Sequence, residues 1–250
     1  MGELYLAIES LYTLPAPNRT LSSLAGILPR AVAEPMRRWT AGGQYGFVFD
    51  NDKDNLTFSR FQCFNFEGID TEILEPLLFY ILHRANQTLG GSSSTVLKAF
   101  VMDEAWLFFR NPTVRAYIVE ALKTWRKKNA ALIVATQSLD ELRNSQILDV
   151  VVESCATKIF LANPDLDPEL YRRVFHLNDT EMAAIADLVP KRQLLIKRPG
   201  LAKVVNLDVD RKSYWLFTND PYENHRREQA IARFGFEQGL EMLASGADQS

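Results

Sequence analysis

The feature that most constrains this chain is an apolar run, residues 99–102, that ends in two adjacent carboxylates. The run is too short for a helix and has polar residues on both sides, which predicts a buried strand. Asp103 and Glu104 then stand at its carboxyl end, the edge of an open α/β sheet where ligands bind. Two acids there suit a hydrated magnesium ion and an attacking water. We therefore predict a Walker B strand, in which Asp103 holds Mg²⁺ through water and Glu104 deprotonates the water that attacks a γ-phosphate.

The same two acids also have a purely structural interpretation, because acids follow strands and complement the dipole at helix N-termini. The next predicted strand, residues 130–135, ends in Thr136-Gln137-Ser138. If the two strands are parallel, their carboxyl ends meet at one sheet edge, and Gln137 lies near Asp103. Gln137 is therefore the candidate sensor of the γ-phosphate or of the attacking water. Its alternative role is that of a polar residue at a strand end.

A basic cluster, Arg126-Lys127-Lys128, ends the helix predicted over residues 114–128. Cations at a helix C-terminus are favoured by the helix dipole, which is one explanation of the cluster. The other is catalytic, since an arginine supplied in trans stabilises the charge of a phosphoryl-transfer transition state. Arg126 is the candidate for that trans-acting cation.

A phosphate-binding loop is missing from these 250 residues. Such a loop reads Gly-x-x-x-x-Gly-Lys-Ser/Thr, so that backbone N–H groups and a lysine surround the phosphates. No glycine in the sequence is followed by lysine, and the Gly-rich stretch at 90–98 precedes a strand rather than a helix. We therefore expect the hydrolytic half of an ATPase without its binding half, either because the chain begins after the loop or because it is a degenerate homologue.

Composition sets broad limits on the class of protein. With 47% hydrophobic residues the chain can bury one large core or two modest ones, and its net charge of −3 gives no signature of a polyanion-binding protein. Cys63 and Cys155, far apart in apolar surroundings, predict buried free thiols in a reducing compartment. The three histidines have no zinc-ligand spacing. No run approaches the roughly 18 apolar residues of a membrane span, and the start predicts no signal peptide.

The alternation of strand and helix patterns over residues 100–161 predicts a parallel sheet covered by helices. We expect one domain, with a helical segment at 1–45, a sheet core at 46–163, and C-terminal helices and a hairpin at 164–250. Predicted helices are 3–12, 20–28, 34–39, 71–89, 114–128, 145–153, 168–175, 180–188 and 221–243, the last followed by a frayed tail over 244–250. Predicted strands are 46–50, 58–66, 99–102, 130–135, 158–162, 193–197, 202–207 and 214–218.

Several motifs in order resemble one family. Phe-Val-Met-Asp-Glu-Ala-Trp at 100–106 is similar to the Walker B segment of TrbE/VirB-type conjugal-transfer ATPases, the motors of type IV secretion systems. The resemblance covers about residues 20–220, and ordered motifs together are more specific than any one alone. The further segments that resemble the family are 122–129, 135–138 with Asp140, 158–164 and 176–181.

This resemblance implies a RecA-like P-loop ATPase fold with a mostly parallel sheet, incomplete at its N-terminal side. It implies a hexamer that binds ATP and Mg²⁺, docks with other secretion subunits on the cytoplasmic side of the inner membrane, and powers pilus assembly and substrate transfer. Asp103 would then hold the metal, with Glu104 as base, Gln137 as sensor and Arg126 acting in trans. Since the loop is missing, we expect the chain alone to be inactive.

Two other functions stay open. One is a non-catalytic assembly or partner-binding module of the same machinery, which the missing phosphate loop favours. The other is a DNA-pumping hexamer of the FtsK/HerA type. The net charge of −3 weighs against direct DNA binding, although Arg226, Arg227 and Arg233 form a small basic stretch.

Overall fold

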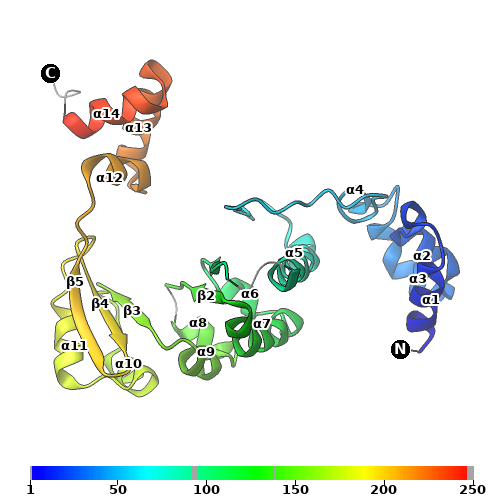
Figure 1. Ribbon diagram of the computed structural model, residues 1–250, viewed down its shortest axis with the longest axis horizontal. Coiled ribbons are helices and arrows are strands. Elements are labelled where there is room, and N and C mark those ends of the chain that lie inside the picture. Colours follow the sequence, from blue (N-terminus) through cyan, green and yellow to red (C-terminus); the bar gives the residue numbers. More distant parts are fainter. Residues whose placement is uncertain (1, 92–94, 138, 247–250) are drawn as a thin grey trace. The chain divides into compact units, whose positions relative to one another are not determined.

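The computed structural model describes residues 2–91, 95–137 and 139–246. The chain divides into two compact units, Met1–Ile147 and Leu148–Ser250 (Figure 1). Each unit has a sheet of its own: a two-stranded parallel sheet in the first, and a three-stranded antiparallel sheet in the second.

Short helices make up the first part of unit 1. They pack around a small core of Ala7, Leu11, Leu24 and Leu28. The first two helices confirm the predictions for 3–12 and 20–28, while the third begins earlier than expected and continues as a 3₁₀ turn. These elements are α1 (Gly2–Tyr12), η1 (Ala16–Asn18), α2 (Leu21–Ile27), α3 (Arg30–Met36), η2 (Arg37–Trp39) and α4 (Gly46–Phe49).

The strand predicted over 46–50 is wrong, because Gly46–Phe49 form α4 and Asp50 caps its C-terminus. The chain folds back so closely here that a Cβ on Gly46 would lie 2.1 Å from the carbonyl oxygen of Thr40. The carboxylate of Asp50 fixes the turn by accepting the backbone N–H groups of Ala41 at 2.6 Å and Ser22 at 3.1 Å. These contacts bend an aromatic segment whose composition favours an extended strand.

The strand predicted over 58–66 is also wrong: this segment is irregular, bends at residues 60–61 and carries no ladder hydrogen bonds. A strand needs a neighbouring strand to pair its backbone groups, and among the described residues no strand pairs with this segment. It is held instead by ring contacts, such as Phe66 against Phe108. Cys63 is exposed, so the expected burial is wrong for that thiol, and Cys155 is half-buried.

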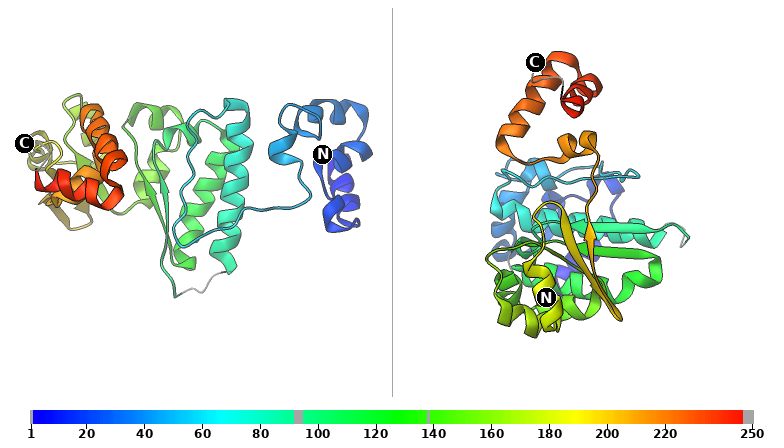
Figure 2. Two further views of the ribbon diagram at one scale, coloured as in Figure 1. Left: turned by 90° about the horizontal axis from the view of Figure 1, so that it is seen from above. Right: turned by 90° about the vertical axis from the view of Figure 1, so that its left-hand side faces the viewer.

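The second part of unit 1 contains the parallel sheet. β1 (Lys98–Met102) and β2 (Ala130–Val134) pair in register, with Met102 opposite Val134. α5 and α7 lie side by side (Figure 2), and the hydroxyl of Tyr117 on α7 donates to the carbonyl of Leu82 on α5 at 2.8 Å. The helices of this part are α5 (Thr71–Gly91), α6 (Trp106–Phe109), α7 (Pro112–Thr124), η3 (Trp125–Lys128) and α8 (Leu139–Asn144).

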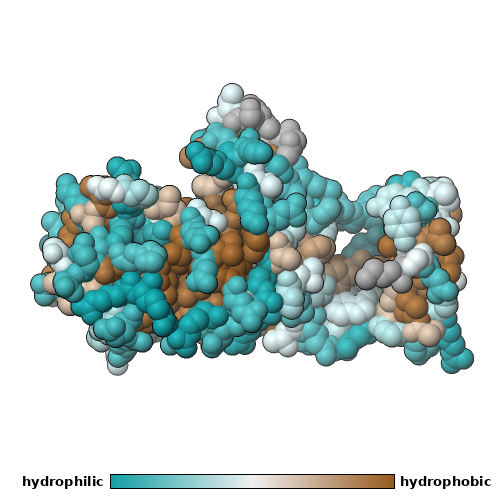
Figure 3. All heavy atoms as spheres, turned by 90° about the horizontal axis from the view of Figure 1, so that it is seen from below, coloured by the Kyte–Doolittle hydropathy of each residue, from teal (hydrophilic) through white to brown (hydrophobic). Residues whose placement is uncertain are grey.

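These elements confirm the predictions for 71–89, 99–102, 114–128 and 130–135, whereas α8 was not expected. The two-sided burial expected of the first strand is wrong. Met102 is buried, but Val101 on the opposite face is 62% exposed, and Ile133 beside it is 50% exposed. Apolar side chains can be seen at the surface in Figure 3. Of the loop expected at 90–95, residues 92–94 lie outside the described residues.

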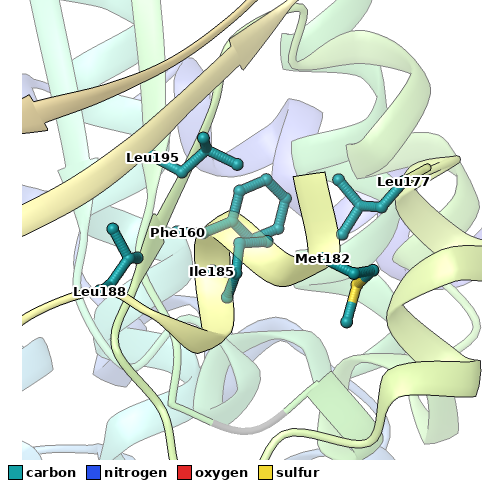
Figure 4. Packing of buried hydrophobic residues seen from close by; sticks show 6 residues of the cluster. All are labelled: Phe160, Leu177, Met182, Ile185, Leu188 and Leu195. Atoms are coloured by element: carbon teal, nitrogen blue, oxygen red, sulfur yellow. The ribbon is translucent and has the colours of Figure 1, made fainter. Parts of the chain in front are cut away.

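Unit 2 is built on an antiparallel sheet of order β3-β4-β5, packed against α11 (Figure 4). Its elements are α9 (Leu148–Ser154), β3 (Lys158–Leu161), α10 (Pro168–Phe175), α11 (Asp179–Ala186), β4 (Gln193–Arg198), β5 (Leu201–Asn206), α12 (Arg211–Phe217), α13 (Pro221–Phe234) and α14 (Phe236–Ser245). The residues buried in its core are Phe160, Leu177, Met182, Ile185, Leu188 and Leu195.

The structure confirms the hairpin and the helices at 168–175 and 180–188, but it corrects three expectations. β3 forms antiparallel pairs with β4 instead of continuing the parallel sheet. Residues 214–218 lie mostly in α12, whose last carbonyls accept hydrogen bonds from Arg227, rather than in a strand. The helix predicted over 221–243 is two helices, broken at Gly235 with φ 81°. Of the tail expected to fray, residues 247–250 lie outside the described residues.

No helix in the described ranges combines the length and the apolar character that crossing a membrane requires.

An ion pair ties the start of α11 to β4. Asn178 and Glu181 form a capping box, in which each side chain accepts the other residue's backbone N–H. The ammonium of Lys197 donates to Glu181 Oε2 at 2.6 Å and to the carbonyl of His176 at 2.8 Å. Burial disfavours the charged carboxyl, but the hydrogen bonds from Lys197 and Asn178 and the charge of Lys197 lower the pKa of Glu181 below its ordinary value of 4.5.

We expect Lys197→Met to lower the free energy of unfolding by about 2 kcal/mol at pH 7, because it leaves Glu181 without its charged donor. A lowered folded-state pKa makes the contribution complete above about pH 4.5, the ordinary value, and lost as the pH falls through the folded-state pKa. Urea unfolding of wild type and variant at neutral and acidic pH should therefore show a difference that shrinks in acid. A difference that is equal at both pH values would contradict this assignment.

Candidate functional site

The acids after β1 and the amide after β2 meet at the carboxyl edge of the parallel sheet. The ladder continues past both strands, since Ala135 N–H donates to the Met102 carbonyl at 2.8 Å and Ala105 N–H to the Ala135 carbonyl at 3.1 Å. This register brings Gln137 to Glu104, and Gln137 Nε2 donates to Glu104 Oε1 at 2.8 Å. The expected proximity is therefore found, with Glu104 rather than Asp103 as the direct contact.

The second carboxylate oxygen of Glu104 is also held. The indole Nε1 of Trp106 donates to Glu104 Oε2 at 2.8 Å. The backbone of Glu104 has φ 46°, in the left-handed region that non-glycine residues rarely adopt. Such a conformation costs about 1–3 kcal/mol and persists where the surroundings impose it. The surrounding structure therefore holds Glu104 in a strained backbone conformation, and this conformation sets the direction of its carboxylate at a cost in stability.

Trp106 was not identified from the sequence as a functional residue. It begins α6, its side chain is half-buried, and the guanidinium of Arg110 lies over its ring at 4.5 Å from the centroid. The sequence did offer one signal for this contact: Trp106 stands two residues after a carboxylate, and an indole can donate a hydrogen bond but not accept one.

Asp103 lies in different surroundings. It is exposed, and its Oδ1 accepts the backbone N–H of Glu104 at 3.0 Å. Within the described ranges, no group of three or more His, Cys, Asp or Glu side chains could hold a metal. Magnesium commonly takes only one or two protein carboxylates, and its other ligands are waters and substrate phosphates. A single exposed carboxylate fits that donor set.

Arg126 is not brought into this group of residues. It lies in η3, at the amino end of β2, and its side chain is exposed. Gln137 follows the opposite end of β2, and the intervening residues separate the two by something on the order of 15 Å. Arg126 therefore does not complete the site of its own chain.

The sequence is similar to those of conjugation and secretion proteins. A family model described as the TraG P-loop domain matches residues 31–247. Conjugal transfer protein TrbE of Rhizobium radiobacter is 34% identical over 190 residues, 73% of this chain and 23% of that protein. Type IV secretion system protein virB4 of Bartonella henselae is 31% identical over 213 residues, 81% of this chain and 26% of that protein.

Among solved structures, VirB4 of Thermoanaerobacter pseudethanolicus matches with a TM-score of 0.60 and 18% sequence identity, over 84% of this chain and 58% of that chain. The likeness confirms the RecA-like α/β fold expected from the sequence. The chain spans about a quarter of the length of the curated relatives it matches.

The left-handed backbone conformation of Glu104 can be tested through protein stability, without any bound nucleotide. We expect Glu104→Gly to be more stable than Glu104→Ala by about 1 kcal/mol, because glycine adopts a positive φ without strain. At Glu120, exposed within α7, the same two substitutions should rank in the opposite order, since glycine weakens a helix interior by about 1 kcal/mol relative to alanine. Urea unfolding of the four variants measures both differences, and an alanine variant at 104 that is as stable as the glycine variant would refute the strain.

Proposed function

Because the chain belongs to the TraG P-loop domain family, we propose that it supplies the hydrolytic half of the nucleotide site in a motor ATPase of type IV secretion and conjugal transfer. The observation that carries this proposal is the carboxylate of Glu104, held at both oxygens where two parallel strands end. No Gly-Lys pair occurs in the sequence, so the phosphate cradle would come from outside these 250 residues.

Each residue at the sheet edge has a distinct role in the proposed reaction. Glu104 orients the attacking water and accepts its proton, which is the task of a general base within hydrogen-bond reach. Gln137, which contacts Glu104 Oε1, senses the γ-phosphate or the same water. Asp103 would hold Mg²⁺ through water. When bound, Mg²⁺ would neutralise negative charge on the phosphate oxygens of ATP.

The relatives support the wider setting of this proposal through their names, which are those of conjugal transfer and type IV secretion proteins. On this basis the intact protein would be a hexamer on the cytoplasmic side of a bacterial inner membrane. It would work with other secretion subunits there and drive pilus assembly and DNA transfer by ATP hydrolysis.

We expect Glu104→Gln to lower kcat for ATP by about 100-fold or more, since a lost general base typically costs 10²–10⁴-fold. Nucleotide binding should be retained, because the amide keeps the shape of the side chain. Both are measured in the protein that combines this chain with its phosphate loop, by Mg²⁺-dependent ATP hydrolysis and by binding of a fluorescent nucleotide. Glu120→Gln, an exposed change on α7, is the control.

Near-wild-type turnover in Glu104→Gln would remove Glu104 from the mechanism. A wild-type protein that neither binds nor hydrolyses ATP would instead favour the non-catalytic assembly module.

Arg126 extends the proposal to the oligomer. Its side chain is exposed at the sheet edge opposite Glu104, so a catalytic role would be exerted on the site of a neighbouring subunit. A trans-acting arginine is worth about 10³–10⁵-fold in phosphoryl transfer. Lys127 is a matched control, since it is the next residue of the same turn and is also exposed.

We expect Arg126→Ala to abolish ATP hydrolysis in the assembled protein, while Lys127→Ala leaves it largely intact. Mixing Arg126→Ala subunits with Glu104→Gln subunits should restore part of the activity, because some interfaces then combine an intact arginine with an intact base. The measurement is ATP hydrolysis as a function of the mixing ratio. Activity in Arg126→Ala equal to that of Lys127→Ala would leave the cluster with the helix-dipole role alone.

A further inference from the structure

The two oxygens of the Glu104 carboxylate are held by donors of different kinds, and this difference has a consequence for catalysis. We propose that Trp106 is the positioning residue of the catalytic base: it fixes Oε2 of Glu104, so that Oε1 is the oxygen that receives the water proton. The proposal rests on the proposed function of Glu104 and assigns a role to a residue that the function itself does not use.

The contact from Trp106 is local and anchored. Donor and acceptor are two residues apart, so both belong to one short segment of the chain. Ala105 before Trp106 and Phe109 at the end of α6 are both fully buried, which fixes the short helix on the core. Arg110, one turn along, lies over the indole ring and restricts its rotation. The indole N–H is therefore a fixed donor at Oε2.

The contact from Gln137 differs in each of these respects. Gln137 follows a different strand, lies 33 positions away in the sequence, and is exposed. A side-chain amide also offers an acceptor oxygen, so it can hydrogen-bond a water or a phosphate group in several ways. Oε1 can consequently change its partner while Oε2 keeps the indole. An indole can only donate, so Oε2 stays occupied by the Trp106 N–H, and Oε1 is the oxygen left to accept the proton of the water.

Fixing one oxygen restricts the rotation of the carboxylate about its terminal bond. Without Trp106, the carboxylate of Glu104 would populate orientations in which neither oxygen faces the water. Misplacement of a catalytic group by about 1 Å can cost 10²-fold in rate. Because substrate contacts are unchanged, the loss should fall on kcat and not on KM.

The contact itself is tested first, in the whole chain and without nucleotide. The four tryptophans give four indole N–H signals in a ¹⁵N NMR spectrum, and Trp106→Phe identifies the signal of Trp106. We expect Glu104→Ala to shift this signal strongly while the signals of Trp39, Trp125 and Trp215 stay in place, which shows that the fold is intact. If the alanine variant does not fold, Glu104→Gly replaces it in this measurement.

In Gln137→Ala the Trp106 signal should remain near its wild-type position, because the indole contact is independent of Gln137. Glu120→Gln is the control, with all four signals expected unchanged. The proposal would be overturned if the Trp106 signal did not move in Glu104→Ala, or if it moved as far in Gln137→Ala as in Glu104→Ala.

Kinetics then separate positioning from a merely structural role. In the protein with its phosphate loop, Trp106→Phe should lower kcat about 10–100-fold at unchanged KM. Trp106→His should recover part of that loss, since imidazole Nε2 occupies the ring position of indole Nε1. Equal kcat values in the phenylalanine and histidine variants would refute the role of the N–H. If Glu104→Gln keeps full activity, the proposed function fails instead, while the NMR result still decides whether Trp106 fixes the carboxylate.

Discussion

The parallel pairing of β1 with β2 is the constraint on which the candidate site depends. Met102 stands opposite Val134, and the ladder continues through Ala105 and Ala135. This register alone carries Gln137 to the side chain of Glu104. A shift of one residue would turn each side chain of one strand to the opposite face and separate the pair. Pairing along the strands thus determines which side chains meet at their ends.

Much of unit 1 around this sheet could be predicted from the sequence, because its signals are local. Strands are marked by short apolar runs, and α7 by an apolar stripe of Val114, Ile118 and Ala121 after the capping residue Asn111. The left-handed residue Asn129 ends η3 directly before β2. Such features act within a few residues and survive in most tertiary contexts.

The wrong strand predictions share a different cause. Residues 46–50, 58–66 and 214–218 are rich in aromatic and β-branched residues, and that composition indicates strands. Strand propensity, however, reflects packing against neighbours as much as backbone preference. At 46–50 the carboxylate of Asp50 and the close contact at Gly46 impose a turn. At 211–217 the guanidinium of Arg227 satisfies the carbonyls at the helix end. These partners are distant enough in sequence that periodicity does not reveal them.

The candidate site shows the same division between local and non-local information. Strand ends predicted that Gln137 would lie near the acids, but the positive φ of Glu104 has no signature in composition or spacing, and the short spacing of Trp106 from Glu104 does not by itself reveal the indole contact at Oε2. These two features distinguish adjacent acids that the sequence presents as equivalent. Asp103 is exposed and bonded to one backbone N–H, which suits a ligand whose other contacts are waters and phosphates. Glu104 is strained and held at both oxygens, which suits a group that must act in one direction. The difference in their surroundings supports the proposed roles of metal ligand for the first and base for the second.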